Sequence, residues 1–209
     1  QAKGGLMAIT TYAELKTSIT SWMDITAADV STKIDDLVTL GEKRIQRECF
    51  TADTEAAFSS AISSGAVAVP STFIKWKFVY LDGTPVQTLE PRTAEWIYSN
   101  YGTRSSSSKP KTIARVATDF IFGPYPDSAY TVIGVYYKKA GTLSSAVYDL
   151  FSNNPDLYLF ACLAESELVI GRDNRVQIWE AKYQKILNDV NLLAKAADVS
   201  GGPLRVRLG

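Results

Sequence analysis

The stretch NPDLYLFACLA at residues 154–164 decides the fold. It predicts a helix, because Asn154 suits an N-cap, Pro155 suits the first helical position and Asp156 complements the positive end of the helix dipole. Every residue from 157 to 164 is apolar or aromatic, so this helix has no polar face over its first two turns. Gly171 supplies a stop signal. A helix without a polar face must be covered on all sides. We therefore expect it to be the central helix of a bundle.

Composition limits the classes of function. The 22 basic and 22 acidic residues cancel, which argues against binding to nucleic acid or membrane through net charge. The chain has no histidine, which excludes Ser-His-Asp and Cys-His nucleophiles and His-ligated zinc. Its two cysteines, Cys49 and Cys162, match no metal-ligand spacing and are expected to be buried structural thiols. We expect no catalytic residue, no metal and no cofactor. The longest apolar run is eight residues, so no membrane partner is expected.

Three further helices are predicted around the central one. Thr11-Tyr12-Ala13-Glu14 is a capping box that starts a helix ending near Met23. A second helix starts at about residues 29–31 and reaches Cys49, with Gly41 on its apolar face. Gly41 either permits a close helix approach or is a tolerated weak spot. The last helix runs from Asp173 or Asn174 to about Ala197.

Residues between the helical halves alternate like strands. β-branched and aromatic residues predict strands at 66–70, 73–81, 86–89, 112–116, 120–122 and 130–137, with a short helix over 91–101. The expected fold is α+β and mainly α, with a four-helix bundle-like core, an inserted small antiparallel β subdomain and an extended C-terminal tail. The expected domain boundaries are 1–7 for a non-native remnant or short extension, 8–65 for the N-terminal helical half, 66–140 for the β subdomain, 141–199 for the C-terminal helical half and 200–209 for the tail.

Two segments are candidate binding sites. A basic run around a serine-rich linker is either a phosphate-contacting loop or a solvated linker. It comprises Arg104, Lys109, Lys111 and Arg115. The tail after Gly201-Gly202 alternates apolar and basic residues, which is typical of a segment that adds to the sheet edge of a partner, although a frayed terminus has the same pattern. Its candidate interface residues are Pro203, Leu204, Arg205, Val206, Arg207 and Leu208.

Several motifs also carry a family resemblance. They include Thr11–Leu15, the sequence LGEKRI at residues 40–45, Pro124–Asp127 before the strand at 130–137, and Pro155–Leu159, together with the tail SGGPLRVR at residues 200–207. In their order and spacing these motifs resemble the head-to-tail adaptor (connector) proteins of tailed bacteriophages. The resemblance spans residues 8–207, essentially the whole chain.

The resemblance implies a virion structural protein and not an enzyme. Such adaptors assemble in the host bacterial cytoplasm as a ring, usually dodecameric, beneath the portal protein at the head–tail junction. They extend the DNA channel and present a surface to tail or nozzle proteins. The expected partners are therefore the portal protein, a tail or nozzle protein, other copies of the chain, and DNA contacted without sequence preference.

Two alternatives belong to other classes. A carboxylate-dependent phage hydrolase needs no histidine and would use acids such as Asp119, Asp127 or Asp149, but their spacing singles out no pair. A small DNA-binding module would use the basic loop at residues 104–115. Zero net charge and the absence of a recognised nucleic-acid-binding motif argue against that second alternative.

Overall fold

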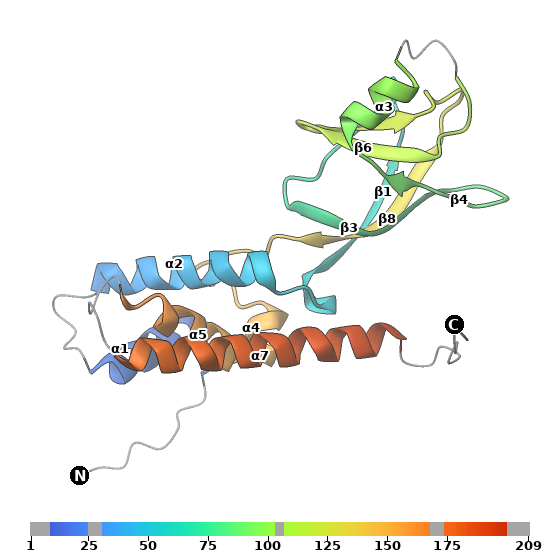
Figure 1. Ribbon diagram of the computed structural model, residues 1–209. Coiled ribbons are helices and arrows are strands. Elements are labelled where there is room, and N and C mark those ends of the chain that lie inside the picture. Colours follow the sequence, from blue (N-terminus) through green and yellow to red (C-terminus); the bar gives the residue numbers. More distant parts are fainter. Residues whose placement is uncertain (1–8, 25–30, 103–106, 168–173, 200–209) are drawn as a thin grey trace. The chain divides into compact units, whose positions relative to one another are not determined.

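The chain folds into two units, each with its own hydrophobic core. The computed structural model describes residues 9–24, 31–102, 107–167 and 174–199 (Figure 1). Residues 1–54 and 140–209 form one unit, hereafter the helical unit, and residues 55–139 form the other, hereafter the β unit.

The helical unit is organised around α5 (Pro155–Ala164). Every side chain from Leu157 to Leu163 is buried, as the absence of a polar face predicts. Figure 1 shows α5 between α2 and α7, and it also contacts α1 and α4. The bounds of these elements are Tyr12–Met23 for α1, Ser31–Glu48 for α2, Asp149–Asn153 for α4 and Asn174–Val199 for α7, with a 3-10 turn η1 at Ala52–Thr54.

The helix ends confirm some of the predicted caps and correct others. The capping box is confirmed, because the Glu14 amide donates to Thr11 Oγ1 (3.2 Å) and the Thr11 amide donates to Glu14 Oε2 (3.0 Å). Asn154 makes no side-chain cap for α5. It also closes α4, and its Nδ2 donates back to the Leu150 carbonyl (3.3 Å). α5 ends at Ala164 and not at Gly171. Just beyond this end, the Ser166 hydroxyl donates a hydrogen bond to the Leu163 carbonyl (2.6 Å), one of the carbonyls that a helix end leaves without a partner.

Gly41 allows α2 and α5 to approach closely. A Cβ built on Gly41 would lie 2.9 Å from Cys162 Sγ and 3.1 Å from the Cys162 amide nitrogen. Cys49 and Cys162 are both buried, as expected. Burial raises the pKa of the Cys49 thiol to about 11 and also raises the pKa of Cys162. Both thiols are therefore protonated at neutral pH and act as small apolar side chains.

The β unit consists of two sheets and one short helix. The first sheet is antiparallel with the order β1-β8-β3-β4, formed by Glu55–Ala61, Thr131–Lys138, Phe73–Leu81 and Gln87–Thr88. The second has the order β2-β7-β6-β5, formed by Ala66–Ala68, Asp119–Gly123, Thr112–Val116 and Glu90–Pro91, and its β5–β6 pair is parallel. Both sheets contribute side chains to one core. α3 (Ala94–Asn100) packs through Ile97 on Ala114 and Ile121 of the second sheet.

The predicted fold class requires correction. The fold is α+β, but it is not mainly α and has no four-helix bundle-like core, because 46% of the described residues are helical and 26% are in strands. The ten residues of α5 are surrounded by helices of 5, 12, 18 and 26 residues, so four helices of similar length do not pack side by side. The β region is not one small antiparallel sheet, because eight described strands form two sheets. The predicted extended tail lies outside the described residues.

Candidate functional site

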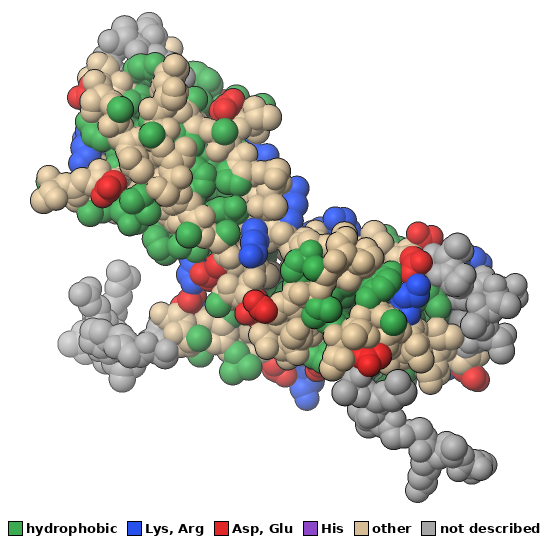
Figure 2. Space-filling view, turned by 180° about the vertical axis from the view of Figure 1, so that it is seen from behind, with side chains coloured by type: hydrophobic (Ala, Val, Ile, Leu, Met, Phe, Trp, Pro, Cys, Tyr) green, Lys and Arg blue, Asp and Glu red, His purple; other side chains and the backbone are tan. Residues whose placement is uncertain are grey.

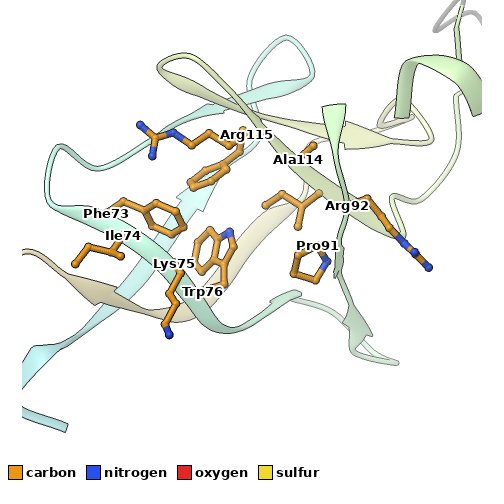
Figure 3. A pocket seen from close by; sticks show the side chains of 10 residues that line it. Phe73, Ile74, Lys75, Trp76, Pro91, Arg92, Ala114 and Arg115 are labelled. Atoms are coloured by element: carbon orange, nitrogen blue, oxygen red, sulfur yellow. The ribbon is translucent and has the colours of Figure 1, made fainter. Parts of the chain in front are cut away.

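A cleft in the β unit lies between the edges of its two sheets. β4 pairs with β3 only at Tyr80 and Leu81, and β5 pairs with β6 only at Thr112 and Ile113. Where these short strands leave the edges uncovered, the cleft, of about 360 Å³, lies between β3 and β6. We call it the inter-sheet cleft. Figure 3 shows the ten side chains that line it: Phe73, Ile74, Lys75, Trp76, Pro91, Arg92, Ile113, Ala114, Arg115 and Phe120.

The floor of the inter-sheet cleft is an aromatic cluster. The ring of Phe120 lies 5.0 Å from that of Phe73 and 5.0 Å from that of Trp76, between centroids. Trp76 also packs edge-on against Phe58 at 5.3 Å. Gly134 on the neighbouring strand makes room for this ring, because a Cβ there would lie 3.1 Å from Trp76 Cζ3. The floor is therefore continuous with the core of the β unit and is held rigidly by it.

Three basic residues line the inter-sheet cleft, and one of them, Arg115, lies over its floor. The Arg115 guanidinium lies over the Phe73 ring at 5.9 Å, and its Nε donates to the Ala117 carbonyl at 3.2 Å. Lys75 Nζ lies 5.2 Å from the centre of the Tyr137 ring. Arg92 pairs with Glu90 at 2.5 Å. None of the ten lining residues is acidic, and Arg115 places positive charge over the apolar floor, whereas the side chains of Lys75 and Arg92 point away from it (Figure 3).

The structure divides the predicted basic run. Arg115 lies at the inter-sheet cleft with Lys75 and Arg92, whereas Lys109 donates to the Pro85 carbonyl (3.0 Å) in the turn between β3 and β4. The Lys111 side chain is exposed, and its backbone amide donates to Gly123 (2.9 Å). Arg104 lies outside the described residues. The tail interface residues Pro203, Leu204, Arg205, Val206, Arg207 and Leu208 also lie outside them.

The acids considered for hydrolysis have local partners. Asp119 accepts from the Thr118 hydroxyl (3.1 Å), and Asp127 accepts from the Tyr130 hydroxyl (2.8 Å). Asp149 lies in the first turn of α4, where a carboxylate complements the helix dipole. In the described ranges no group of three or more His, Cys, Asp or Glu could hold a metal ion. None of the helices described there is long and apolar enough to cross a membrane.

A charged cluster in the helical unit escapes prediction from sequence. Arg44 on α2 donates through Nη1 to Glu180 on α7 (2.7 Å) and to Glu165 after α5 (3.2 Å), and its guanidinium lies 4.4 Å from the centre of the Tyr183 ring. The hydrogen bond from Arg44 lowers the pKa of the Glu180 carboxyl. Arg44 and Glu180 are 136 positions apart, so no local pattern reveals the cluster. The cluster joins α2, α7 and the end of α5, and its charged groups are paired with one another, so we assign it a structural role.

Glu42 is a second buried charge of the helical unit. Its side chain is 5% exposed, and Oε1 accepts from the Leu143 amide at 2.6 Å. Burial raises the pKa of Glu42, against the opposing effect of that hydrogen bond. The bond fixes the segment that returns to the helical unit after residue 139. Glu42 therefore has a structural role.

Comparison with known proteins decides what kind of molecule carries this architecture. A family model described as SU10 adaptor protein matches residues 10–207. The chain belongs to this family of phage head-to-tail adaptors. The adaptor is therefore a virion component, and its family points to a structural role and not to catalysis. No curated protein matches the chain.

Proposed function

We propose that this adaptor forms a ring, dodecameric in the virion, below the portal protein. There it extends the DNA channel and presents the attachment surface for a tail or nozzle protein. The observation that carries the proposal is the family match over residues 10–207, which takes in every described helix and strand from α1 to α7. The two units, each with its own core, suit a protein that offers separate surfaces to different neighbours.

The proposed portal contact is the tail. In an extended segment Leu204, Val206 and Leu208 point one way, and Arg205 and Arg207 point the other. The backbone would pair with a sheet edge, and the arginines would meet acidic groups. Ordering such a segment costs about 1–2 kcal/mol per residue, so a single copy binds weakly. Many copies around a ring hold firmly through multivalency.

The proposed DNA contact is the basic loop. Arg104, Lys109 and Lys111 face either the DNA channel or a neighbouring subunit in the ring. Contacts to phosphate are independent of sequence and weaken as salt rises. Replacing these three residues with serine is expected to impair DNA retention or ring assembly while the isolated chain keeps its stability. A normal yield of DNA-filled particles from the triple variant would reduce the loop to a solvated linker.

The proposed docking is tested with portal-bearing particles and the purified chain. The full chain is expected to co-sediment with the particles, and a chain lacking residues 203–209 is expected to stay folded and remain in the supernatant. Arg205→Ser with Arg207→Ser, compared with Leu204→Ser with Val206→Ser, separates the charged from the apolar contribution. Mass measurement with and without the portal gives the copy number. Unchanged docking of the truncated chain would place the attachment surface elsewhere.

A further inference from the structure

The inter-sheet cleft has the chemistry of a binding site that the tail and the basic loop do not explain. Its volume of about 360 Å³ lies within the range of ligand pockets, and its floor of Phe73, Trp76 and Phe120 is apolar. Arg115 lies over that floor, and none of the lining residues is acidic. The surrounding unit adds to this field. Residues 55–139 contain nine basic and six acidic residues, and the rest of the neutral chain contains thirteen and sixteen.

One wall of the inter-sheet cleft is an open strand edge. β5 runs beside β6 as far as Ile113, where the Arg92 amide donates to the Ile113 carbonyl (2.9 Å). The chain then turns into α3, which Thr93 caps by accepting from the Trp96 amide at 3.2 Å. On the edge of β6 away from β7, none of the described strands continues beside residues 114–116. An extended segment from another chain that lies in line with β5 would meet this backbone edge.

The opposite wall is protected against strand pairing. β3 shifts register between Phe73 and Lys75 and again between Trp76 and Phe78, and it carries Lys75 and Lys77. Irregularities and lysines of this kind blunt a sheet edge. The two walls therefore differ, with backbone pairing available on the β6 side and side-chain contacts available on the β3 side.

The charges and the floor select the occupant. We propose that the inter-sheet cleft binds an extended segment of another protein in which a large apolar residue is flanked by Asp or Glu. The apolar side chain packs on the floor, a carboxylate beside it meets Arg115, and the backbone pairs with residues 114–116. The chain's own tail does not suit the site, because Arg205 and Arg207 would meet the like charge of Arg115.

The aromatic floor also argues against single-stranded DNA as the occupant. Base stacking needs ring faces presented flat to the groove. Trp76 is instead enclosed by rings at 5.0 to 6.2 Å, with Phe58, Phe73 and Tyr136 packed edge-on or tilted against it or against each other. Such a floor accepts a side chain between its rings and has little flat surface for a base.

The proposal is tested with the purified full chain, so the result is independent of docking on the portal. The probe is a displayed library of random peptides about twelve residues long, with the strongest binders resynthesised for affinity measurement. We expect enrichment of peptides with Asp or Glu beside Trp, Phe or Leu. Arg115→Glu is expected to weaken their binding about ten-fold or more, and Arg115→Lys, which keeps the charge, is expected to weaken it less. The matched control is Lys139→Glu, the same charge reversal at an exposed lysine that does not line the cleft.

Three outcomes overturn the proposal. The library yields no enriched sequence, the enriched peptides lack acids, or Arg115→Glu and Lys139→Glu weaken binding equally. A parallel titration with fluorescent oligothymidylate tests single-stranded DNA as the alternative partner. Binding of that DNA with loss in Arg115→Glu, and no peptide enrichment, would assign the cleft to nucleic acid. Thermal unfolding of each variant checks that the fold is intact, and we expect it to be, because Arg115 is exposed and contacts the core only through the ring of Phe73.

Discussion

An arginine lies at the margin of the core in both the helical unit and the β unit, but the two arginines have different partners. In the helical unit, Arg44 is met by the carboxylates of Glu165 and Glu180, so the core around α5 is closed by charges that satisfy one another. In the β unit, Arg115 lies over the ring of Phe73 at the mouth of the inter-sheet cleft. A core sealed by internal ion pairs holds a fold together. The core of the β unit instead reaches the surface at the inter-sheet cleft, where Arg115 lies over an aromatic ring and a partner could bind.

The largest expected effect tests the closed core. Leu163 is 0% exposed on α5, and Leu163→Ala is expected to lower the free energy of unfolding by about 2–5 kcal/mol, because the cavity is walled by other helices. Leu193→Ala on α7 is the control, since Leu193 is 71% exposed and its truncation should cost less than about 0.5 kcal/mol. Urea unfolding measures both. Equal costs for the two variants would contradict the central position of α5.

The sequence predicts two local features of the helical unit correctly, although the predicted four-helix bundle-like core is wrong. The capping box at Thr11 and Glu14 and the apolar run of α5 are signals within a few residues, and both appear in the structure. β1 escapes prediction, because its sequence EAAFSSA is rich in residues with weak strand preference.

The candidate site was harder to predict, because it depends on tertiary pairing. The inter-sheet cleft exists because β4 and β5 are only two residues long and leave the edges of β3 and β6 uncovered. Sequence singles out Arg115 but gives no sign that Lys75 and Arg92 join it. The Arg44 cluster is hidden for the same reason.

The next expected effect tests the ion pairs of Arg44 at the margin of the helical core. Arg44→Met should cost about 1–3 kcal/mol, because it leaves Glu165 and Glu180 without their common partner. The control Lys16→Met breaks an exposed pair with Asp35 and should cost at most about 1 kcal/mol.

The pH dependence of Arg44→Met has a defined sign. The folded-state pKa of Glu180 is lowered chiefly by its hydrogen bond with Arg44, so the pair stabilises the fold above the unfolded pKa of about 4.3. That stabilisation is lost as the pH falls through the folded pKa. The difference in unfolding free energy between wild type and Arg44→Met should therefore shrink from pH 7 to pH 3. A difference independent of pH would mean that packing, and not the ion pair, closes the core.

Gly134→Ala makes the matching test in the β unit. The added Cβ would lie 2.5 Å from the Phe78 carbonyl oxygen and 3.1 Å from Trp76, so backbone or ring must move. We expect a loss of about 1–3 kcal/mol. Amide hydrogen exchange should then quicken in β3 and β8 more than in α5. Equal acceleration in both units would show that the two cores do not respond separately.

The smallest expected effect is that of Glu42, whose pKa is shifted in the opposite direction to that of Glu180. Burial raises the folded pKa of Glu42, so its contribution to stability is fully present below the unfolded pKa and is lost as the pH rises through the folded pKa. Glu42→Gln removes the charge and keeps an acceptor for the Leu143 amide. It should therefore be neutral or stabilising by up to about 1 kcal/mol at pH 7, with the gain lost near pH 4. A clear destabilisation at pH 7 would show that Leu143 needs the carboxylate.

The adaptor assignment is tested most directly by electron cryomicroscopy of DNA-filled particles that contain this chain. The proposed function predicts a ring of density between portal and tail, coaxial with the DNA channel, into which the helical unit and the β unit fit separately. Particles in which portal and tail touch directly, with the chain absent or bound elsewhere on the capsid, would contradict it.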